Sequence, residues 1–144
     1  MKKLAIVFTL LISCSGGGGG GGDDNGTSPT LNTVTAYKMT DAGWVESLWF
    51  EIGDEVNLDV FASDPDKNIK TIHMVEYYSV GGELVEWQYV DDVLPTQQGV
   101  DYHYYFLENL IVNGPAGDWR ECVYLVDSKG NESNEICINT VVTN

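Results

Sequence analysis

Residues 56–66, VNLDVFASDPD, decide the fold class, because apolar and polar side chains alternate along them until a proline ends the pattern. Successive side chains of an extended strand point to opposite faces, so one face of this segment is apolar and the other is largely polar. The apolar face carries Val56, Leu58, Val60 and Ala62. Pro65 has no N–H group to donate to a sheet, and it therefore ends the strand. We predict a half-buried strand over residues 56–63 that ends at residues 64–66.

Alternation with period two continues along the rest of the chain, and no stretch shows the spacing of an amphipathic helix. It predicts further strands over residues 69–78, 84–90, 102–107, 119–126 and 135–142. The pair Gly81-Gly82 suits a two-residue hairpin turn, in which both positions can require a positive φ. With that turn, Tyr78 faces Val85 and Glu76 faces Trp87. The sequence therefore predicts an all-β domain.

The hairpin around this turn would have two different faces. One face carries Ile72, Met74, Tyr78, Val85, Trp87 and Tyr89, and the other carries His73, Val75, Tyr77, Leu84, Glu86 and Gln88. Because the first face is the more apolar one, we expect it to lie in the core and most of its rings to be buried.

Two cysteines, Cys122 and Cys137, lie in the two strands of the last predicted hairpin. If residues 129–130 form the centre of its turn, the cysteines stand directly opposite each other, at a separation that a disulfide spans. In the same register Glu121 faces Ile138. Closing a loop of about 15 residues would stabilise the fold by about 3 kcal/mol at most. We predict a structural disulfide within this hairpin.

Two segments resemble bacterial immunoglobulin-like repeats, including PKD-like and cadherin-like ones. Residues 60–69 look like the V-x-A-x-D-P-D-x-x-I segment of these repeats, and residues 117–133 look like their penultimate strand with its G-x-W/Y … V-x-D-x-x-G-N-x-S turn. The resemblance implies a single antiparallel β-sandwich of about seven strands, of the immunoglobulin or fibronectin type III kind. A bridge within one hairpin departs from antibody domains, whose disulfide joins the two sheets.

The amino terminus has the features of an export signal. Lys2 and Lys3 precede an apolar stretch over residues 4–12, which is too short to span a membrane as a helix. Residues 11–14, LISC, resemble the lipobox of bacterial lipoproteins, in which the leader is cut before the cysteine and the cysteine thiol is lipidated. The resemblance implies a lipid anchor on Cys14. Because Ser15 follows it rather than an aspartate, the resemblance also implies sorting to the outer membrane.

Seven consecutive glycines at residues 16–22 begin a low-complexity run that cannot bury enough apolar area to fold. No Lys-Ser/Thr follows them, so they do not form a phosphate-binding loop. A Gly-rich coil over residues 15–30 has a root-mean-square reach of about 20 to 25 Å. We therefore divide the chain into a signal peptide (residues 1–13), a lipidated cysteine with a flexible linker (residues 14–30) and the sandwich domain (residues 31–144).

The chain is strongly acidic, with a formal net charge of −15. Removing Lys2 and Lys3 with the leader leaves 5 basic residues against 22 acidic ones, a net charge of −17. Such a field repels nucleic acid and anionic lipid headgroups, so we expect no nucleic-acid partner. The exported setting is oxidising, which favours the predicted disulfide.

The resemblance to cadherin-like repeats also suggests a Ca²⁺ site, since those repeats use an Asp-x-Asp pair at the corresponding turn. Asp64 and Asp66 match the pair, and Asp127 and Asn131 would add oxygen ligands from a second turn. The alternative is that these side chains cap ordinary turns. Calcium is the one cofactor that the sequence suggests.

The aromatic side chains of Tyr78, Trp87 and Tyr89 could stack on a sugar or contact a partner, or they could simply pack in the core. Catalysis has less support. His73 and His103 are the only histidines, each lies in a predicted strand, and no G-x-S-x-G or H-E-x-x-H motif is present. We predict that the protein is not an enzyme.

These features together predict a membrane-anchored binding module outside the cytoplasm, lipidated at Cys14. The favoured partner is an envelope or extracellular protein, which would make the module an adhesin or an accessory subunit of an envelope assembly. A Ca²⁺-dependent or carbohydrate-binding lipoprotein is the alternative, and a small hydrolase is a more distant one.

Overall fold

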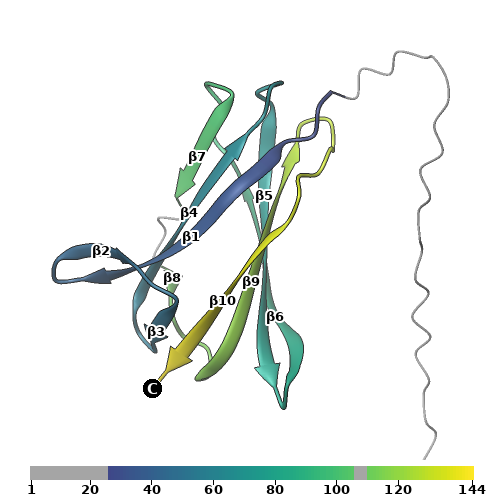
Figure 1. The fold of residues 1–144 in the computed structure, drawn as a ribbon. Coiled ribbons are helices and arrows are strands. Elements are labelled where there is room, and N and C mark those ends of the chain that lie inside the picture. Colours follow the sequence, from purple (N-terminus) through teal and green to yellow (C-terminus); the bar gives the residue numbers. More distant parts are fainter. Residues whose placement is uncertain (1–25, 106–109) are drawn as a thin grey trace, which may run out of the picture.

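The domain is an immunoglobulin-like β-sandwich of two facing sheets (Figure 1). A computed structural model describes residues 26–105 and 110–144. These residues contain ten strands and no helix. Seven of the strands are five residues or longer, in agreement with the seven or so that the sequence predicts, and the other three are short strands that add to the sheet edges.

The first sheet contains strands in the order β2-β1-β4-β7, and β8 also pairs with β4. Its strands are β1 (Thr30–Thr40), β2 (Gly43–Glu46), β4 (Glu55–Ser63), β7 (Asp101–Tyr105) and β8 (Leu110–Ile111). The second sheet has the order β3-β10-β9-β5-β6. Its strands are β3 (Trp49–Glu51), β5 (Ile69–Val80), β6 (Glu83–Val93), β9 (Gly117–Asp127) and β10 (Ile136–Thr143). The β3–β10 pair is parallel and all the other pairs are antiparallel.

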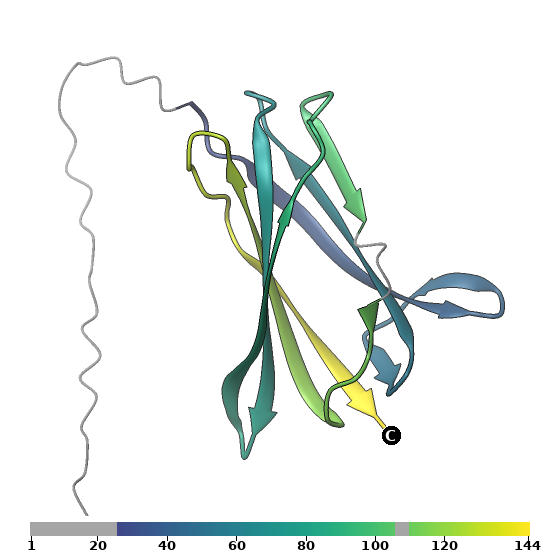
Figure 2. The same cartoon turned by 180° about the vertical axis from the view of Figure 1, so that it is seen from behind.

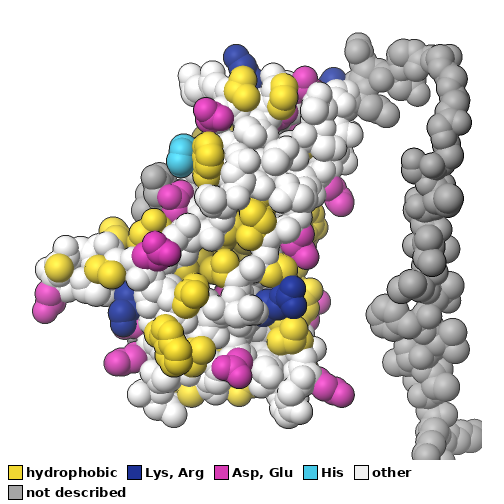
Figure 3. Space-filling view, in the orientation of Figure 1, with side chains coloured by type: hydrophobic (Ala, Val, Ile, Leu, Met, Phe, Trp, Pro, Cys, Tyr) yellow, Lys and Arg dark blue, Asp and Glu magenta, His cyan; other side chains and the backbone are white. Residues whose placement is uncertain are grey.

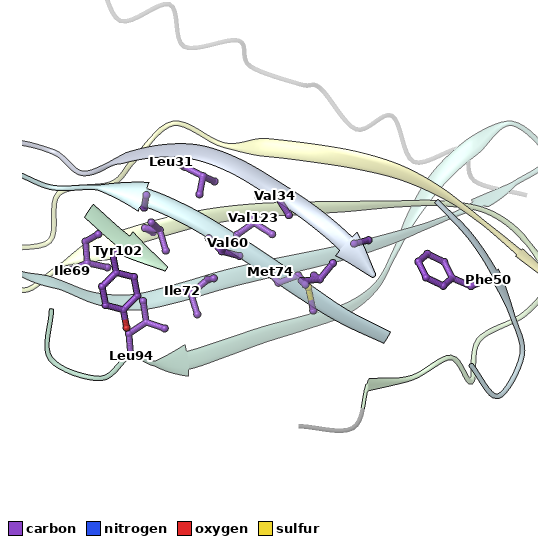
Figure 4. Packing of buried hydrophobic residues seen from close by; sticks show 14 residues of the cluster. Leu31, Val34, Phe50, Val60, Ile69, Ile72, Met74, Leu94, Tyr102 and Val123 are labelled. Atoms are coloured by element: carbon purple, nitrogen blue, oxygen red, sulfur yellow. The ribbon is translucent and has the colours of Figure 1, made fainter. Parts of the chain in front are cut away.

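The quoted segment forms β4, at the middle of the first sheet, and its inward face is the predicted one. Leu58, Val60 and Ala62 are buried, and Val56 is half-buried. Across the sandwich, the inward residues of the second sheet include Ile72 and Met74, each at most 1% exposed. Figure 4 shows Val60 of the first sheet near Ile72 and Met74 of the second, between the sheets. The core therefore forms from the apolar rows that period-two alternation places on the inward faces of both sheets.

One end of the sandwich is closed by buried polar side chains. Asp64 is wholly buried, and its two carboxylate oxygens accept hydrogen bonds from the backbone N–H groups of Asp66 and Asn68, at 3.0 and 2.8 Å. The buried Gln97 amide donates to backbone carbonyls of residues 99 and 100 and accepts from Ile69 N–H. These bonds satisfy the turns at this end, which makes burial of both polar groups tolerable.

The hairpin turn is confirmed, but the predicted pairing beyond it is wrong. Gly81 and Gly82 have φ values of 63° and 89°, as a two-residue turn of this type requires. Tyr78 pairs with Val85 as predicted, whereas Glu76 pairs with Gln88, because a β-bulge adds Trp87 to β6. A one-residue bulge shifts every later side chain of its strand relative to the partner.

The predicted burial of this hairpin is partly wrong. Ile72 and Met74 lie in the core, but Val85, Trp87 and Tyr89 are each about half exposed, at 52%, 50% and 48%. Past the bulge, Tyr89 pairs with the outward-facing Val75. The end of the hairpin also projects beyond the packed part of the two sheets (Figures 1 and 2).

The predicted disulfide is confirmed. Cys122 of β9 pairs with Cys137 of β10, and their sulfurs are bonded. The bridge lies within one sheet, and the inward face of the same pair carries Val123, which is completely buried, opposite Ile136. The bond therefore joins two neighbouring strands on the side away from the core.

We expect the disulfide to stabilise the domain by up to about 3 kcal/mol, because it closes a loop of about 15 residues. The double variant Cys122→Ala/Cys137→Ala should unfold at a lower denaturant concentration than the wild type. Reducing agent should lower the midpoint of the wild type and leave that of the variant unchanged. An identical wild-type midpoint with and without reductant would show that the bond does not stabilise the fold.

Candidate functional site

A cavity of about 220 Å³ lies between the sheets, toward the end of the sandwich that carries β3, β8 and the C-terminus (Figures 1 and 2). Residues from both sheets and from the loop before β9 form its walls: Ala36, Phe50, Val56, Leu58, Glu76, Trp87, Gln88, Ile111, Val112, Asn113, Gly114, Trp119, Glu121, Ile138, Thr140 and Val142. Trp87 and Ile111 are about half exposed, at 50% and 48%, and come from β6 and β8. The cavity therefore reaches solvent at the side of these two strands.

Two carboxylates lie in the wall that the second sheet provides. Glu76 of β5 pairs directly with Glu121 of β9, in the same inward-facing rows as Met74 and Val123. The Oε1 atom of Glu121 accepts a hydrogen bond from the Thr140 hydroxyl at 2.8 Å. Its Oε2 atom is buried and has no hydrogen-bond partner. The inward surface thus changes from apolar to acidic where the cavity begins.

Burial raises the pKa of both glutamates. For Glu121, burial is the largest cause of the raised pKa, and the neighbouring Glu76 charge raises the pKa further. The Thr140 hydrogen bond lowers the pKa, and the resulting value is about 7. For Glu76, burial raises the pKa above its ordinary value of 4.5. An acid whose pKa differs this much from its ordinary value inside a cavity is typical of a functional site.

Aromatic rings form the adjoining wall. The Trp87 and Trp119 rings meet edge to face with centroids 5.5 Å apart, and Tyr78 lies 5.1 Å from Trp119. The Trp119 indole N–H donates to the Pro115 carbonyl at 3.0 Å. Gly114 leaves room for this indole, since a Cβ atom there would lie 2.3 Å from its Cζ2 atom. The loop before β9 is therefore shaped around the Trp119 ring.

The carboxylates suggested as Ca²⁺ ligands do not gather in a ready-made cluster, and the Ca²⁺ site stays a prediction. Within the described residues, Asp64, Asp66 and Asp127 do not form a cluster with ligand atoms within 4.8 Å of one another. Asp64 caps its own turn, and Asp66 accepts from Thr27 N–H at 2.6 Å. Asp127 accepts from the Asn131 backbone and side chain, both at 2.8 Å. Burial alone would raise the pKa of Asp127, but these bonds outweigh it and lower that pKa.

The aromatic residues singled out from the sequence separate into two groups. Tyr78 and Trp87 meet beside the cavity, with centroids 6.5 Å apart. Tyr89 lies on the outer face, where its hydroxyl is 2.7 Å from Nδ1 of His73 and 3.4 Å from the Tyr124 hydroxyl. The hydrogen bond with Tyr124 raises the pKa of Tyr89. The three rings therefore do not form one flat stacking surface.

The two histidines lie on strands of different sheets. His73 of β5 stacks on Tyr124 with centroids 4.6 Å apart, and His103 of β7 stacks on Phe61 at 4.4 Å. Neither histidine is part of the cavity wall. Cys14 and the glycine run lie outside the described residues. Among the residues that the structure describes, no helix is long and apolar enough to cross a membrane.

The acidic pair was not recognised as a site from the sequence, although a signal was present. The register that places Cys122 opposite Cys137 also puts Glu121 opposite Ile138, and the structure confirms that pairing. A glutamate in an inward-facing row contradicts the apolar pattern around it. Glu121 therefore marks the position in its strand at which the apolar core ends and the cavity begins.

Comparison with known proteins supports the fold and assigns no family. No family model and no curated protein matches the sequence. Among solved structures, a Niemann-Pick type C2 protein from Japanese carpenter ant superposes with a TM-score of 0.55 at 9% identity, over 84% of this chain and 97% of that one. Spo0M, a sporulation control protein from Bacillus subtilis, has a TM-score of 0.47 at 13% identity, over 82% of this chain and 50% of its own. Fold and site together define a β-sandwich with an acidic, aromatic cavity between its sheets.

The buried acid predicts an unusual dependence of stability on pH. The raised pKa of Glu121, about 7 against an ordinary 4.5, means that the folded state prefers the protonated acid. Its stabilising contribution is present below about pH 4.5 and is lost as the pH rises through about 7. We expect the free energy of unfolding to fall by up to about 3 kcal/mol between pH 5 and pH 8, at about 1.4 kcal/mol per pKa unit.

Chemical denaturation across this pH range measures the effect. Glu121→Gln should flatten the profile and raise stability at pH 8. Glu86→Gln is the matched control, because Glu86 is exposed on β6 and pairs with Tyr77 outside the cavity. A wild-type profile that is flat or rises over this range would contradict the burial of an acid at this site.

Proposed function

We propose that this chain is a membrane-anchored binding module, lipidated at Cys14, that holds a small ligand between its two sheets. The observation that carries the proposal is the cavity, whose wall combines apolar side chains with a buried carboxylate oxygen, Oε2 of Glu121, that has no hydrogen-bond partner. Pockets for small ligands commonly have this composition, mainly apolar with a few converging polar groups.

The volume limits what the cavity can hold. An engineered cavity of about 150 Å³ in another protein binds benzene, so about 220 Å³ suits a ligand with on the order of ten non-hydrogen atoms. The half-exposed Trp87 and Ile111 give such a ligand a route from solvent. A larger ligand would extend past these two side chains into solvent.

The first test uses toluene as a small uncharged probe, titrated into the full chain while the indole N–H resonances are followed by NMR. Gly114→Ala should weaken binding at least tenfold, because its Cβ atom would displace the Trp119 ring. Gly99→Ala is the matched control, since its Cβ atom would have no neighbour nearer than 3.7 Å. Equal affinity in the two variants would place the probe outside this cavity, and no binding to the wild type would refute the proposed function.

A second candidate function is recognition of an envelope protein, as expected from the sequence. Large hydrophobic side chains on and between β1, β2 and β3 are between 38% and 65% exposed: Met39, Trp44, Val45, Leu48, Trp49 and Ile52. Figure 3 shows hydrophobic and acidic side chains together on this face. Exposed apolar groups with a polar surround are typical of protein contacts.

The position of this surface favours a protein over the bilayer. Strand β1 begins at Thr30, next to the linker, and runs for 11 residues toward the hairpin with β2. At about 3.3 Å per residue, the strand places the hairpin about 35 Å from the point where the linker enters the domain. The exposed side chains therefore lie at the end of the domain away from the proposed lipid anchor.

Cross-linking in intact cells followed by pull-down tests this second function. The lipidated protein should recover one specific envelope partner, and Cys14→Ala should leave the membrane fraction and lose it. Trp49→Ala should also lose the partner, because Trp49 is 65% exposed. Trp87→Ala, which alters the cavity, should retain it. Recovery of only abundant porins and other lipoproteins would count against a stable protein partner.

A further inference from the structure

The charge of the two cavity glutamates has no counter-ion in the cavity wall. Glu76 and Glu121 stand directly opposite each other on neighbouring strands, an arrangement that destabilises a sheet when both are ionised. Within the described part of the chain, no lysine or arginine lines the cavity. The β1–β4 register places Lys38 on the inward face beside Val56. Its ammonium nitrogen forms an ion pair with Oδ2 of Asp54, at 3.5 Å, rather than with the two glutamates. When both acids are ionised, their negative charge is therefore not compensated by the cavity wall.

One oxygen of this site lacks any donor. The Oε2 atom of Glu121 is buried without a hydrogen bond, although Thr140 satisfies the other oxygen of the same carboxylate. When this acid is ionised, a buried oxygen without a partner costs free energy, so a donor that arrives with a ligand would stabilise the ionised form. Because the acceptor belongs to a carboxylate, a positively charged donor would satisfy it best.

The neighbouring rings favour the same kind of ligand. Trp87 and Trp119 line the cavity beside the two acids. The face of an indole attracts a cation more strongly than other aromatic side chains do. An ammonium group next to an apolar body would therefore meet carboxylates on one side and rings on the other.

We propose that the ligand of the cavity is an organic cation, whose ammonium group lies between Glu76 and Glu121 and whose apolar body lies against Trp87 and Trp119. This inference rests on the proposed function and names its ligand class. The raised pKa of both glutamates agrees with it, because burial opposes the ionisation of each, and the Glu76 charge further opposes that of Glu121, until a cation offsets the charge. The net charge of −15 would attract cations toward the domain.

Other charged ligands fit the cavity less well. An anion would be repelled by both carboxylates. In the residues that the structure describes, the two glutamates do not form a metal-sized cluster with a third His, Cys, Asp or Glu side chain. A calcium ion takes six to eight oxygen ligands, usually from several carboxylates, and only two carboxylates of the described residues line this wall. A primary ammonium group has three N–H donors, which the four oxygens of the two carboxylates can accept, and it gains from the rings.

Three probes of matched size separate charge from shape: benzylammonium, benzyl alcohol and benzoate, each titrated into the full chain by calorimetry at pH 7.5. We expect benzylammonium to bind at least tenfold more tightly than benzyl alcohol, and benzoate to bind at least tenfold more weakly than the alcohol. Glu121→Gln should lose most of the preference for the cation, and Glu76→Gln should reduce it. Glu86→Gln, outside the cavity, should keep it.

The outcomes distinguish this inference from the function on which it rests. If the alcohol and the ammonium bind equally, and Glu121→Gln changes neither, the cavity binds small ligands but the cationic class is wrong. If no probe binds, and toluene does not bind either, the proposed function itself fails. Both glutamine variants remove a buried like-charge contact, so a melting temperature at or above that of the wild type will confirm that they fold.

Discussion

The packing of apolar side chains between the two sheets is the interaction on which the rest of the structure depends. The inward rows of β4 and β1 meet the inward rows of β5 and β9, and the residues at their centre, such as Val60, Ile72 and Val123, are completely buried. Removing this apolar surface from water is the main term that offsets the loss of chain entropy. Each strand must therefore keep its register, since a one-residue slip would turn its apolar row to solvent.

The same rows become polar before the sandwich ends, and this change creates the cavity. On β5 the inward residue after Met74 is Glu76, and on β9 it is Glu121 opposite Glu76. Carboxylates cannot close against Phe50 and Leu58 as methyl groups would, because burial of an unpaired charge is costly. The opposite end of the sandwich buries Asp64, and backbone N–H groups there satisfy both of its oxygens. Closed and open ends thus differ in whether the protein supplies partners for its buried acids.

The arrangement of the chain gives the two ends different surroundings. Strand β1 starts at the closed end, where the linker enters, and the cavity and the exposed β1–β2 hairpin lie toward the other end (Figures 1 and 2). A lipid anchor at Cys14 would hold the closed end nearer the membrane and leave both candidate binding surfaces directed away from it. Both surfaces belong to the same sandwich, so a ligand between the sheets and a protein at the hairpin could be bound by one domain.

The sequence by itself determined the all-β class, the glycine turn at residues 81–82 and the disulfide, because these features depend on local alternation and on residues that face each other across a single turn. The tertiary structure alone decided which side chains form the site. The extra residue at Trp87 shifts the pairing of β6, places Gln88 opposite Glu76 and turns Tyr89 outward. A bulge of this kind cannot be recognised from period-two alternation. The cavity also brings Glu121 together with rings from β6 and apolar residues from the other sheet, and these contacts join residues far apart in sequence. Local patterns report which face a residue occupies, whereas packing between sheets decides whether that face is filled or left open.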